Sequence, residues 1–269
     1  MTRKKVGLAL SSGAAWGLAH IGVLAELAKG GVPVDMITGT SMGAIVGSFY
    51  ATGKNPDEIA EAARAFSRRR ILSLADFDLP TRGLIKGGKL RNWLKSVIGD
   101  RHFDELNLPF ACLSTDINTG EAVVLREGLV APAVAASASI PGLFTPVRRD
   151  GRYLVDGWLV EPLPVALLRE MGADFIIAVS VMPYLGGRGD GEAAVDKSRP
   201  PTLIGSLIRM MYIMGCQAAW AAVAQADVMI TPSLTGIRPD SFDRLPDCIR
   251  SGMRAAREAV PEIKVRLGA

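Results

Sequence analysis

The chain has 269 residues, of which 49% are hydrophobic and 22% are charged, and its formal net charge is +4. This balance excludes a disordered or fibrous chain and is typical of a globular enzyme, and so small a charge surplus argues against nucleic acid as a partner. The same mild positive charge is compatible with contact to an anionic membrane surface. We expect one domain covering residues 1–269.

The cysteines and the N-terminal residues indicate the cellular compartment. The three cysteines, Cys112, Cys216 and Cys248, lie far apart and lack the spacing of a disulfide frame or a zinc site. The basic start imitates a secretory signal, but its apolar run, Val6 to Leu10, is shorter than the roughly 7–15 residues that a signal needs. No stretch reaches the roughly 20 apolar residues of a membrane span. We therefore predict a cytoplasmic protein without a bound metal, and membrane contact, if any, at the periphery.

From the N-terminus onward, short apolar runs alternate with helical patterns. KKVGLAL precedes a helix expected from about Trp16 to Lys29, and VDMIT precedes another from Met42 to about Thr52. This order is that of βαβ units, in which parallel strands are joined by crossover helices and ligands gather at the carboxyl ends of the strands. We therefore predict an α/β fold with a mostly parallel central sheet.

The remaining elements follow the same logic. FACLSTDI and EAVVLRE flank Asn118-Thr119-Gly120 and predict a hairpin, RYLVDG predicts a strand that enters a turn, and FIIAVSV predicts a buried strand. Helices are expected at 56–69, 89–98, 130–138, 162–171, 203–225 and 247–259. The segment at about 183–202 is rich in glycine, proline and charge, which predicts a flexible surface loop.

The loop after the first strand contains only small residues, Ser11-Ser12-Gly13-Ala14-Ala15, and opens directly into a helix. Small side chains let backbone N–H groups point outward, and a helix N-terminus favours an anion such as a phosphate or the oxyanion of acyl transfer. The alternative is a tight turn that needs small residues only for packing. The glycine spacing does not match the G-x-G-x-x-G of a dinucleotide site, so no nucleotide cofactor is expected.

The next strand ends in Gly39-Thr40-Ser41-Met42-Gly43, which spells G-x-S-x-G. In this pattern the serine lies on a sharp turn between a strand and a helix, with its hydroxyl exposed for nucleophilic attack. VDMIT before it and MGAIVGSFYA after it supply the required strand and helix. Gly39 and Gly43 leave room for tight packing, so Ser41 is the candidate nucleophile.

The base that activates Ser41 is the next question. The two histidines, His20 and His102, offer no Ser-Asp-His order, and we interpret the first as a packing residue and the second as a solvated loop residue. A carboxylate can replace imidazole when burial raises its pKa. Asp156, which ends an apolar strand before Gly157, is the preferred candidate, although Asp-Gly also suits a simple turn. Asp116 is the competitor, but it lies at the approach to the predicted hairpin.

At these residues the chain resembles the patatin-like phospholipase family, in particular its bacterial subgroup. Four motifs in order carry the resemblance over nearly the whole chain: VGLALSSGAAWGLAHIGVL, GTSMGAIVG, ASASIPGLFTPV and DGWLVEPLP. The resemblance implies a three-layer α/β/α sandwich and a serine acyl-ester hydrolase of the lipase, phospholipase A or lysophospholipase type, with no cofactor. Its substrate would be a lipid or another acyl ester.

The resemblance also assigns the site. Ser41 would be the nucleophile and Asp156 its partner in a dyad, while backbone N–H groups near Gly13 and Ala14 would form the oxyanion hole and an acyl-enzyme would be the intermediate. One alternative is a catalytically weak or inactive patatin-like protein that binds lipid or regulates. Another is a serine peptidase or thioesterase with the same dyad.

Two departures from the family pattern stand out. Trp16 replaces a basic residue in the glycine-rich loop, so this chain lacks the positive charge that could hold an anionic headgroup or steady the loop. Trp158 replaces a small residue beside the aspartate, where its ring is expected to narrow the acyl pocket. The apolar, mildly basic segments 83–95 and 202–224 are expected at the rim that meets lipid.

Overall fold

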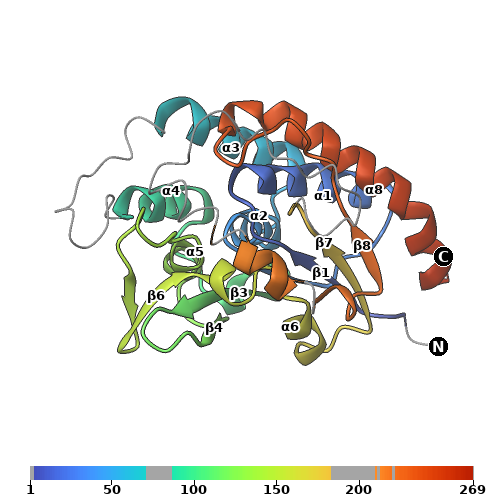
Figure 1. Ribbon diagram of the computed structural model, residues 1–269. Helices are drawn as coiled ribbons and strands as arrows, with labels where there is room; N and C mark the ends of the chain where they lie inside the picture. The colour runs from blue at the N-terminus through green and yellow to red at the C-terminus, as the bar shows by residue number, and fades with distance from the viewer. Residues whose placement is uncertain (1–2, 71–86, 183–209, 211–212, 220–221, 269) are drawn as a thin grey trace.

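The computed structural model describes residues 3–70, 87–182, 210, 213–219 and 222–268, and these residues form one layered α/β body (Figure 1). The predicted flexible loop at 183–202 lies outside the described residues, as do much of the predicted 203–225 helix and parts of both predicted rim segments. The strands are β1 (Val6–Leu10), β2 (Met36–Thr40), β3 (Phe110–Asp116), β4 (Ala122–Leu125), β5 (Val147–Arg149), β6 (Arg152–Asp156), β7 (Phe175–Val179) and β8 (Val228–Ile230). The α-helices are α1 (Ala19–Lys29), α2 (Met42–Ala51), α3 (Pro56–Arg70), α4 (Gly88–Ile98), α5 (Val130–Ser137), α6 (Val165–Glu170) and α8 (Leu245–Leu267).

The strands pair into one sheet in the order β5-β6-β3-β2-β1-β7-β8, with β4 on the second edge of β3. The run from β3 through β2, β1 and β7 to β8 is parallel, whereas β4, β5 and β6 pair antiparallel. The prediction of an α/β fold with a mostly parallel sheet is therefore confirmed. The hairpin at Asn118-Thr119-Gly120 is also present, as the turn between β3 and β4.

Strand β3 aligns two other strands end to end. Its Leu113 pairs with Thr40 of β2, and the next residue, Ser114, pairs with Asp156 of β6. Strand β4 pairs with both of these β3 residues and so occupies the opposite edge. Because β2 runs parallel and β6 antiparallel to β3, the C-terminal ends of β2 and β6 meet on one edge. The sequence predicted the β6 strand but not its direction.

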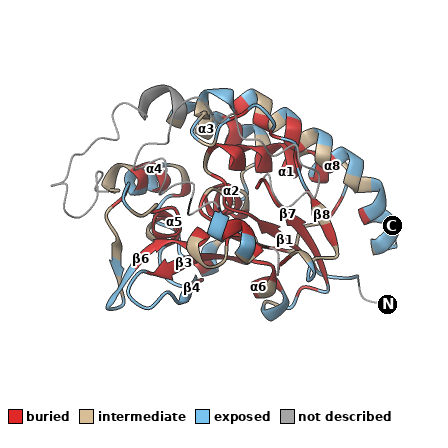
Figure 2. Cartoon of the chain, in the orientation of Figure 1, coloured by how far each residue is buried: buried red, intermediate tan, exposed pale blue. Residues whose placement is uncertain are grey.

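Helices cover both faces of the sheet (Figure 2). Because side chains alternate along a strand, Leu8 and Leu10 of β1 face the core shared with α1, α2, α4, α5 and α8. Ala9 faces the other core, which it shares with α6 and with Cys216, Ala219 and Ala222. The strands between the two cores are buried on both faces, as expected for parallel sheets. In the described part of the chain, no helix combines the length and apolarity needed to cross a bilayer.

The longest helix, α8, packs closely against α1. A Cβ atom on Gly22 would overlap the carbonyl of Ile249, and one on Gly252 would overlap the carbonyl of Ala19, so the crossing requires glycine on both helices. An ion pair of 2.6 Å between Arg257 and Glu26 adds to the contact. This packing carries α8 to Leu267, beyond the predicted end at residue 259.

Other element boundaries also differ from prediction. Residues 14–18 form a 3-10 turn, so α1 begins at Ala19 rather than at Trp16. The predicted 162–171 helix begins only at Val165, after Pro164. Proline fixes its own backbone and removes a hydrogen-bond donor, which favours a helix start immediately after it.

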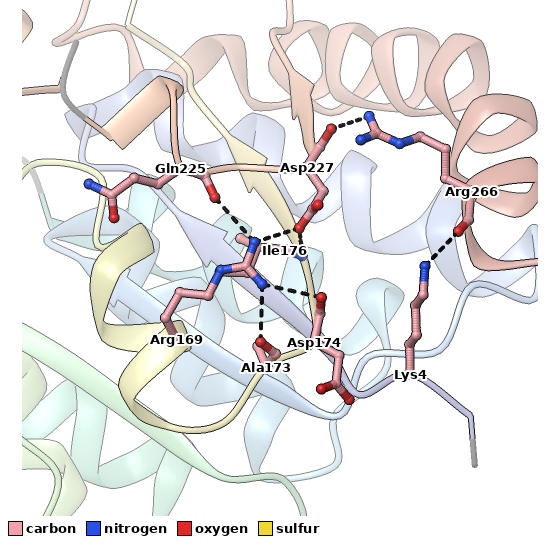
Figure 3. A network of polar contacts seen from close by, with 8 residues as sticks. All are labelled: Lys4, Arg169, Ala173, Asp174, Ile176, Gln225, Asp227 and Arg266. Carbon is pink, nitrogen blue, oxygen red and sulfur yellow. Dashed lines mark hydrogen bonds and ion pairs between the residues drawn. The ribbon is translucent and has the colours of Figure 1, made fainter. Parts of the chain in front are cut away.

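A polar network ties the elements together at the N-terminal end of the parallel strands (Figure 3). Arg169 of α6 donates to three backbone carbonyls and forms an ion pair of 2.8 Å with Asp227, whose carboxylate also accepts the N–H of Ile176. Arg266 of α8 donates to the Asp227 carbonyl, and its own carbonyl accepts from Lys4. The network therefore joins α6, β7, β8 and α8 at the sheet end opposite Ser41.

Candidate active site

Ser41 lies on the turn between β2 and α2 in a conformation that is unfavourable for any residue with a side chain. Its φ is 56° and its ψ is −118°. A Cβ atom on Gly43 would overlap the Leu10 carbonyl, and one on Gly39 would lie 2.5 Å from the Gly43 carbonyl oxygen. Both glycines of G-x-S-x-G are thus required by close backbone approach. The turn has the sharp strand-to-helix geometry that the motif predicts.

Asp156 meets Ser41 at this turn. The Ser41 hydroxyl donates to Asp156 Oδ2 over 2.6 Å, and the backbone N–H of Trp158 donates to Oδ1 over 2.9 Å. Asp156 is fully buried, and Ser41 is 5% exposed. The two side chains are 115 residues apart in sequence and meet because β2 and β6 end at neighbouring positions on β3.

The environment of Asp156 makes its carboxylate unusually basic. Burial raises the pKa of Asp156 from 3.8 to about 7, although the hydrogen bonds from Ser41 and from the N–H of Trp158 act to lower it. A carboxylate with a pKa near neutrality is a useful general base, provided that it already accepts a hydrogen bond from the hydroxyl it is to deprotonate. The pair satisfies both conditions.

Side-chain hydroxyl groups form hydrogen bonds with the backbone of both Ser41 and Asp156. Ser137 Oγ accepts the Ser41 N–H over 3.0 Å and donates to the Leu113 carbonyl over 2.6 Å. Thr115 Oγ1 donates to the Asp156 carbonyl over 3.0 Å. Sequence reasoning assigned these residues no role. Ser137 lies in the motif ASASIPGLFTPV and Thr115 in the predicted strand FACLSTDI. Their positions in the sequence do not show that they form hydrogen bonds with Ser41 and Asp156.

The loop of residues 11–16, called here the 11–16 loop, presents two free amides. Four of its six N–H groups have backbone acceptors: Ser11 donates to Val179, Ser12 to Pro162, Ala15 to Pro239 and Trp16 to Gly13. Within the described chain, the N–H groups of Gly13 and Ala14 have no such acceptor. A Cβ atom on Gly43 would lie 2.6 Å from the Ser11 carbonyl oxygen, so the Ser41 turn packs directly against this loop.

At Gly13 and Ala14 the 11–16 loop has an unusual backbone conformation and very close packing. Ala14 has a φ of 47°, and a Cβ atom on Gly13 would overlap the side chain of Val181. Backbone N–H groups without an acceptor at a helix start are available to stabilise an oxyanion. The loop can therefore take this part, and the oxyanion-hole assignment itself stays a prediction.

The histidines lie where the sequence suggested, away from the base position. His20 is fully buried, and its Nε2 lies 2.8 Å from the Ser11 carbonyl, which can only accept, so this nitrogen carries the hydrogen. Burial lowers the pKa of His20 to about 4, which keeps the ring neutral. His102 is exposed and precedes a short 3-10 turn. Among the described residues, no group of three or more His, Cys, Asp or Glu side chains is arranged to hold a metal ion.

The competing carboxylate, Asp116, belongs to the hairpin. It accepts the Asn118 N–H over 3.0 Å and lies 3.6 Å from Arg152. Asp116 thus shapes the turn between β3 and β4, as its place in the sequence indicated. Of the two candidate bases, the structure brings only Asp156 to Ser41.

Apolar side chains surround the turn. Trp158 is 3% exposed, and its ring lies so close to the backbone of Gly215 that a Cβ atom there would overlap the indole nitrogen. Met42, the residue after Ser41, is one of the side chains that line a separate apolar cavity of about 30 Å³. The cavity is lined by Leu18, Ile21, Met42, Ile45, Val46, Phe49, Ile59, Ala63, Phe66, Trp93 and Phe242. Trp158 does not line this cavity, so its predicted effect on the acyl pocket stays a prediction.

Comparison with known proteins finds a matching family and several similar chains. Residues 8–169 match the family described as Patatin-like phospholipase. An uncharacterized NTE family protein of Mycobacterium tuberculosis is 38% identical over 177 residues, covering 66% of this chain and 49% of that protein. The neuropathy target esterase sws of Drosophila melanogaster is 32% identical over 186 residues, which are 67% of this chain and 13% of that protein. The chain spans about half the length, or less, of these curated relatives.

Among solved structures, VipD from Legionella pneumophila has the same fold. It superposes with a TM-score of 0.64 at 12% sequence identity, covering 97% of this chain and 66% of VipD. At this identity the likeness concerns the fold alone. It adds to the α/β architecture described above, in which a mostly parallel sheet lies between helices.

Proposed function

The chain belongs to the patatin-like phospholipase family, and from that premise we propose that it is a serine acyl-ester hydrolase of the lipase, phospholipase A or lysophospholipase type. Ser41 is the nucleophile and Asp156 the general base. The observation that carries the proposal is the 2.6 Å hydrogen bond from the Ser41 hydroxyl to a fully buried carboxylate whose pKa is raised to about 7.

The proposed reaction has two halves. In the first, Asp156 accepts the proton of Ser41 as Oγ attacks the ester carbonyl, and the tetrahedral intermediate collapses to an acyl-enzyme while Asp156 returns the proton to the leaving alcohol. In the second, Asp156 takes a proton from water, the resulting hydroxide attacks the acyl-enzyme, and the proton returns to Ser41 as the fatty acid leaves. The dyad is thereby regenerated without any other proton carrier.

The two free amides of the 11–16 loop serve the charged intermediates. In both halves the former carbonyl oxygen becomes an oxyanion, and the N–H groups of Gly13 and Ala14 are assigned to it. Because these donors are held in place before the reaction, they stabilise the charge without reorganisation. Removal of one such donor costs on the order of 3–4 kcal/mol of transition-state stabilisation in comparable sites.

An apolar substrate suits the surroundings of the dyad. The cavity that Met42 helps to line has apolar walls, and we assign it to part of the acyl group. The Drosophila relative carries the name of an esterase, which agrees with ester hydrolysis. The three cysteines are free and buried, which fits the reducing compartment expected from the sequence.

A fluorophosphonate probe tests the assignment directly, because it labels only an activated serine. We expect stoichiometric labelling of the wild type, none of Ser41→Ala, and a loss of labelling in Asp156→Asn. Asp116→Asn is the matched control: it removes the competing carboxylate and should leave labelling unchanged. Failure to label correctly folded wild-type protein would overturn the proposal and favour a catalytically inactive lipid-binding protein.

A substrate panel then defines the class of ester. Esters of graded acyl length, lysophospholipids and diacyl phospholipids are compared with thioesters and peptides under the same conditions. We expect turnover of oxygen esters and a rate that depends on acyl length. A clear preference for peptides or thioesters would contradict the lipid assignment while leaving the dyad chemistry in place.

A further inference from the structure

We propose that Trp16 is a positioning residue that holds the free amides of Gly13 and Ala14 in place by anchoring the 11–16 loop to residues 234–239, called here the 234–239 segment. The inference rests on the proposed function, because positioning matters only if these amides stabilise an oxyanion. It assigns a purpose to a residue at which the chain departs from the pattern of the family it belongs to.

The first step concerns the loop itself. The two free amides are followed directly by two anchored residues. The N–H of Ala15 donates to the Pro239 carbonyl over 2.9 Å, and the indole Nε1 of Trp16 donates to the Ile237 carbonyl over 2.7 Å. The backbone N–H of Trp16 also closes a turn onto the Gly13 carbonyl over 3.0 Å. The free amides therefore belong to a turn whose last two residues are bound to the 234–239 segment.

The 234–239 segment is itself held by hydrogen bonds and by two buried side chains. The N–H of Ile237 donates to the Leu234 carbonyl over 3.0 Å, and Gly236 has a φ of 77°, the conformation that such a turn needs. Leu234 and Ile237 are 8% and 6% exposed and pack in the core. Ser251 of α8 donates to the Ser233 carbonyl just before the segment. The anchor is therefore itself tied to the core and to α8.

Loss of the Trp16 hydrogen bond carries an energetic cost. Trp16 is 2% exposed, so its hydrogen bond to Ile237 lies in the interior, where an unpaired carbonyl is unfavourable. Without the indole N–H, the Ile237 carbonyl must move toward another donor or admit water, and the loop shifts with it. Oxyanion donors act only at about 2.7–3.1 Å from the developing charge. A shift of roughly 1 Å therefore costs on the order of 100-fold in rate.

The sequence position of the anchor is informative. The family match ends at residue 169, and the 234–239 segment lies beyond it. The buried indole reaches this segment through a neutral hydrogen bond. The chain thus ties its 11–16 loop to a C-terminal segment.

The test compares Trp16→Phe with Arg257→Ala. Trp16→Phe keeps a buried aromatic ring and removes the indole N–H together with part of the ring system, whereas Arg257→Ala removes the ion pair between α1 and α8, which does not involve the 11–16 loop. For a short-chain ester, we expect kcat to fall about 10- to 100-fold in Trp16→Phe with KM within about twofold of wild type. The inhibition constant of a trifluoromethyl ketone, which forms a tetrahedral adduct with a serine, should rise by the same factor as kcat/KM falls.

Arg257→Ala should lower the melting temperature and leave kcat and the inhibition constant unchanged. If Trp16→Phe lowers the melting temperature but not kcat, or if it raises KM alone, the residue is merely structural and the inference is wrong. A common loss of kcat in both variants would overturn it as well, because global destabilisation would then explain the effect.

A second readout does not depend on turnover. In ¹⁵N-labelled protein, we expect the backbone amide resonances of Gly13 and Ala14 to move in Trp16→Phe and to stay in place in Arg257→Ala. Unmoved resonances in Trp16→Phe would refute the inference even in an active enzyme. Wild-type protein that hydrolyses no ester would instead refute the proposed function, and the resonances would still decide whether Trp16 positions the loop.

Discussion

Replacement of Asp156 by asparagine should stabilise the fold above neutral pH while it abolishes turnover. In the folded protein the Asp156 carboxyl has a pKa of about 7, whereas its ordinary value is 3.8. Between these values the folded state binds a proton that the unfolded state has lost. The stability contributed by this proton is therefore complete below about pH 4 and disappears as the pH rises through 7.

The magnitude follows from the two pKa values. A difference between 3.8 and about 7 corresponds to about 4 kcal/mol, of which about 3 kcal/mol is lost between pH 5 and pH 8. The asparagine variant has no charge to bury, and its amide can still accept the N–H of Trp158. Because all other titrating groups are common to both proteins, their contributions cancel in the difference.

Urea unfolding of both proteins from pH 5 to pH 8 measures this difference. We expect the free energy of unfolding of Asp156→Asn, relative to wild type, to increase by about 3 kcal/mol over this range. Parallel pH profiles of the two proteins would refute the reasoning, because Asp156 would then ionise as readily in the folded state as in the unfolded chain.

Two further predictions concern activity. The value of kcat/KM should rise tenfold per pH unit below about pH 7 and level off above it, since only the ionised Asp156 can accept the Ser41 proton. A midpoint near pH 4 in the pH–rate profile would contradict this prediction. Gly13→Ala should lower kcat at least about tenfold in an ester assay, because the added Cβ would overlap Val181 and displace the 11–16 loop. Gly88→Ala is the control: its added Cβ has no neighbouring atom within 4 Å, so kcat should be unchanged in the same assay.

The parts that the sequence predicted are those with a local signal. Ser41 lies between an apolar strand and a helix pattern, with glycines on both sides, and Asp156 ends an apolar strand before a glycine. Such signals are short-range, because strand periodicity and turn chemistry depend on neighbouring residues. They suffice to name the α/β class and the two side chains, Ser41 and Asp156, that the hydrogen bond joins.

The parts that could not be predicted depend on distant contacts. The direction of β6 follows from its pairing with β3, which no local pattern records. Ser137 lies 96 residues from Ser41, and Ile237 lies 221 residues from Trp16, yet both contribute hydrogen bonds at the site. A serine or a tryptophan in a motif does not reveal its partner. Only the assembled sheet and its covering helices bring these groups together.

The meeting of β2 and β6 on one edge of β3 has an evolutionary consequence. The spacing between Ser41 and Asp156 is set by two neighbouring pairs in a strand ladder, Thr40 with Leu113 and Ser114 with Asp156, and not by the length of the chain between them. Insertions in the turns at 117–121 or 141–146 leave this ladder intact. The surroundings of Ser41 and Asp156 are therefore free to diversify, while a slip of one residue in either strand would turn its side chains to the opposite face and break the hydrogen bond between the two residues.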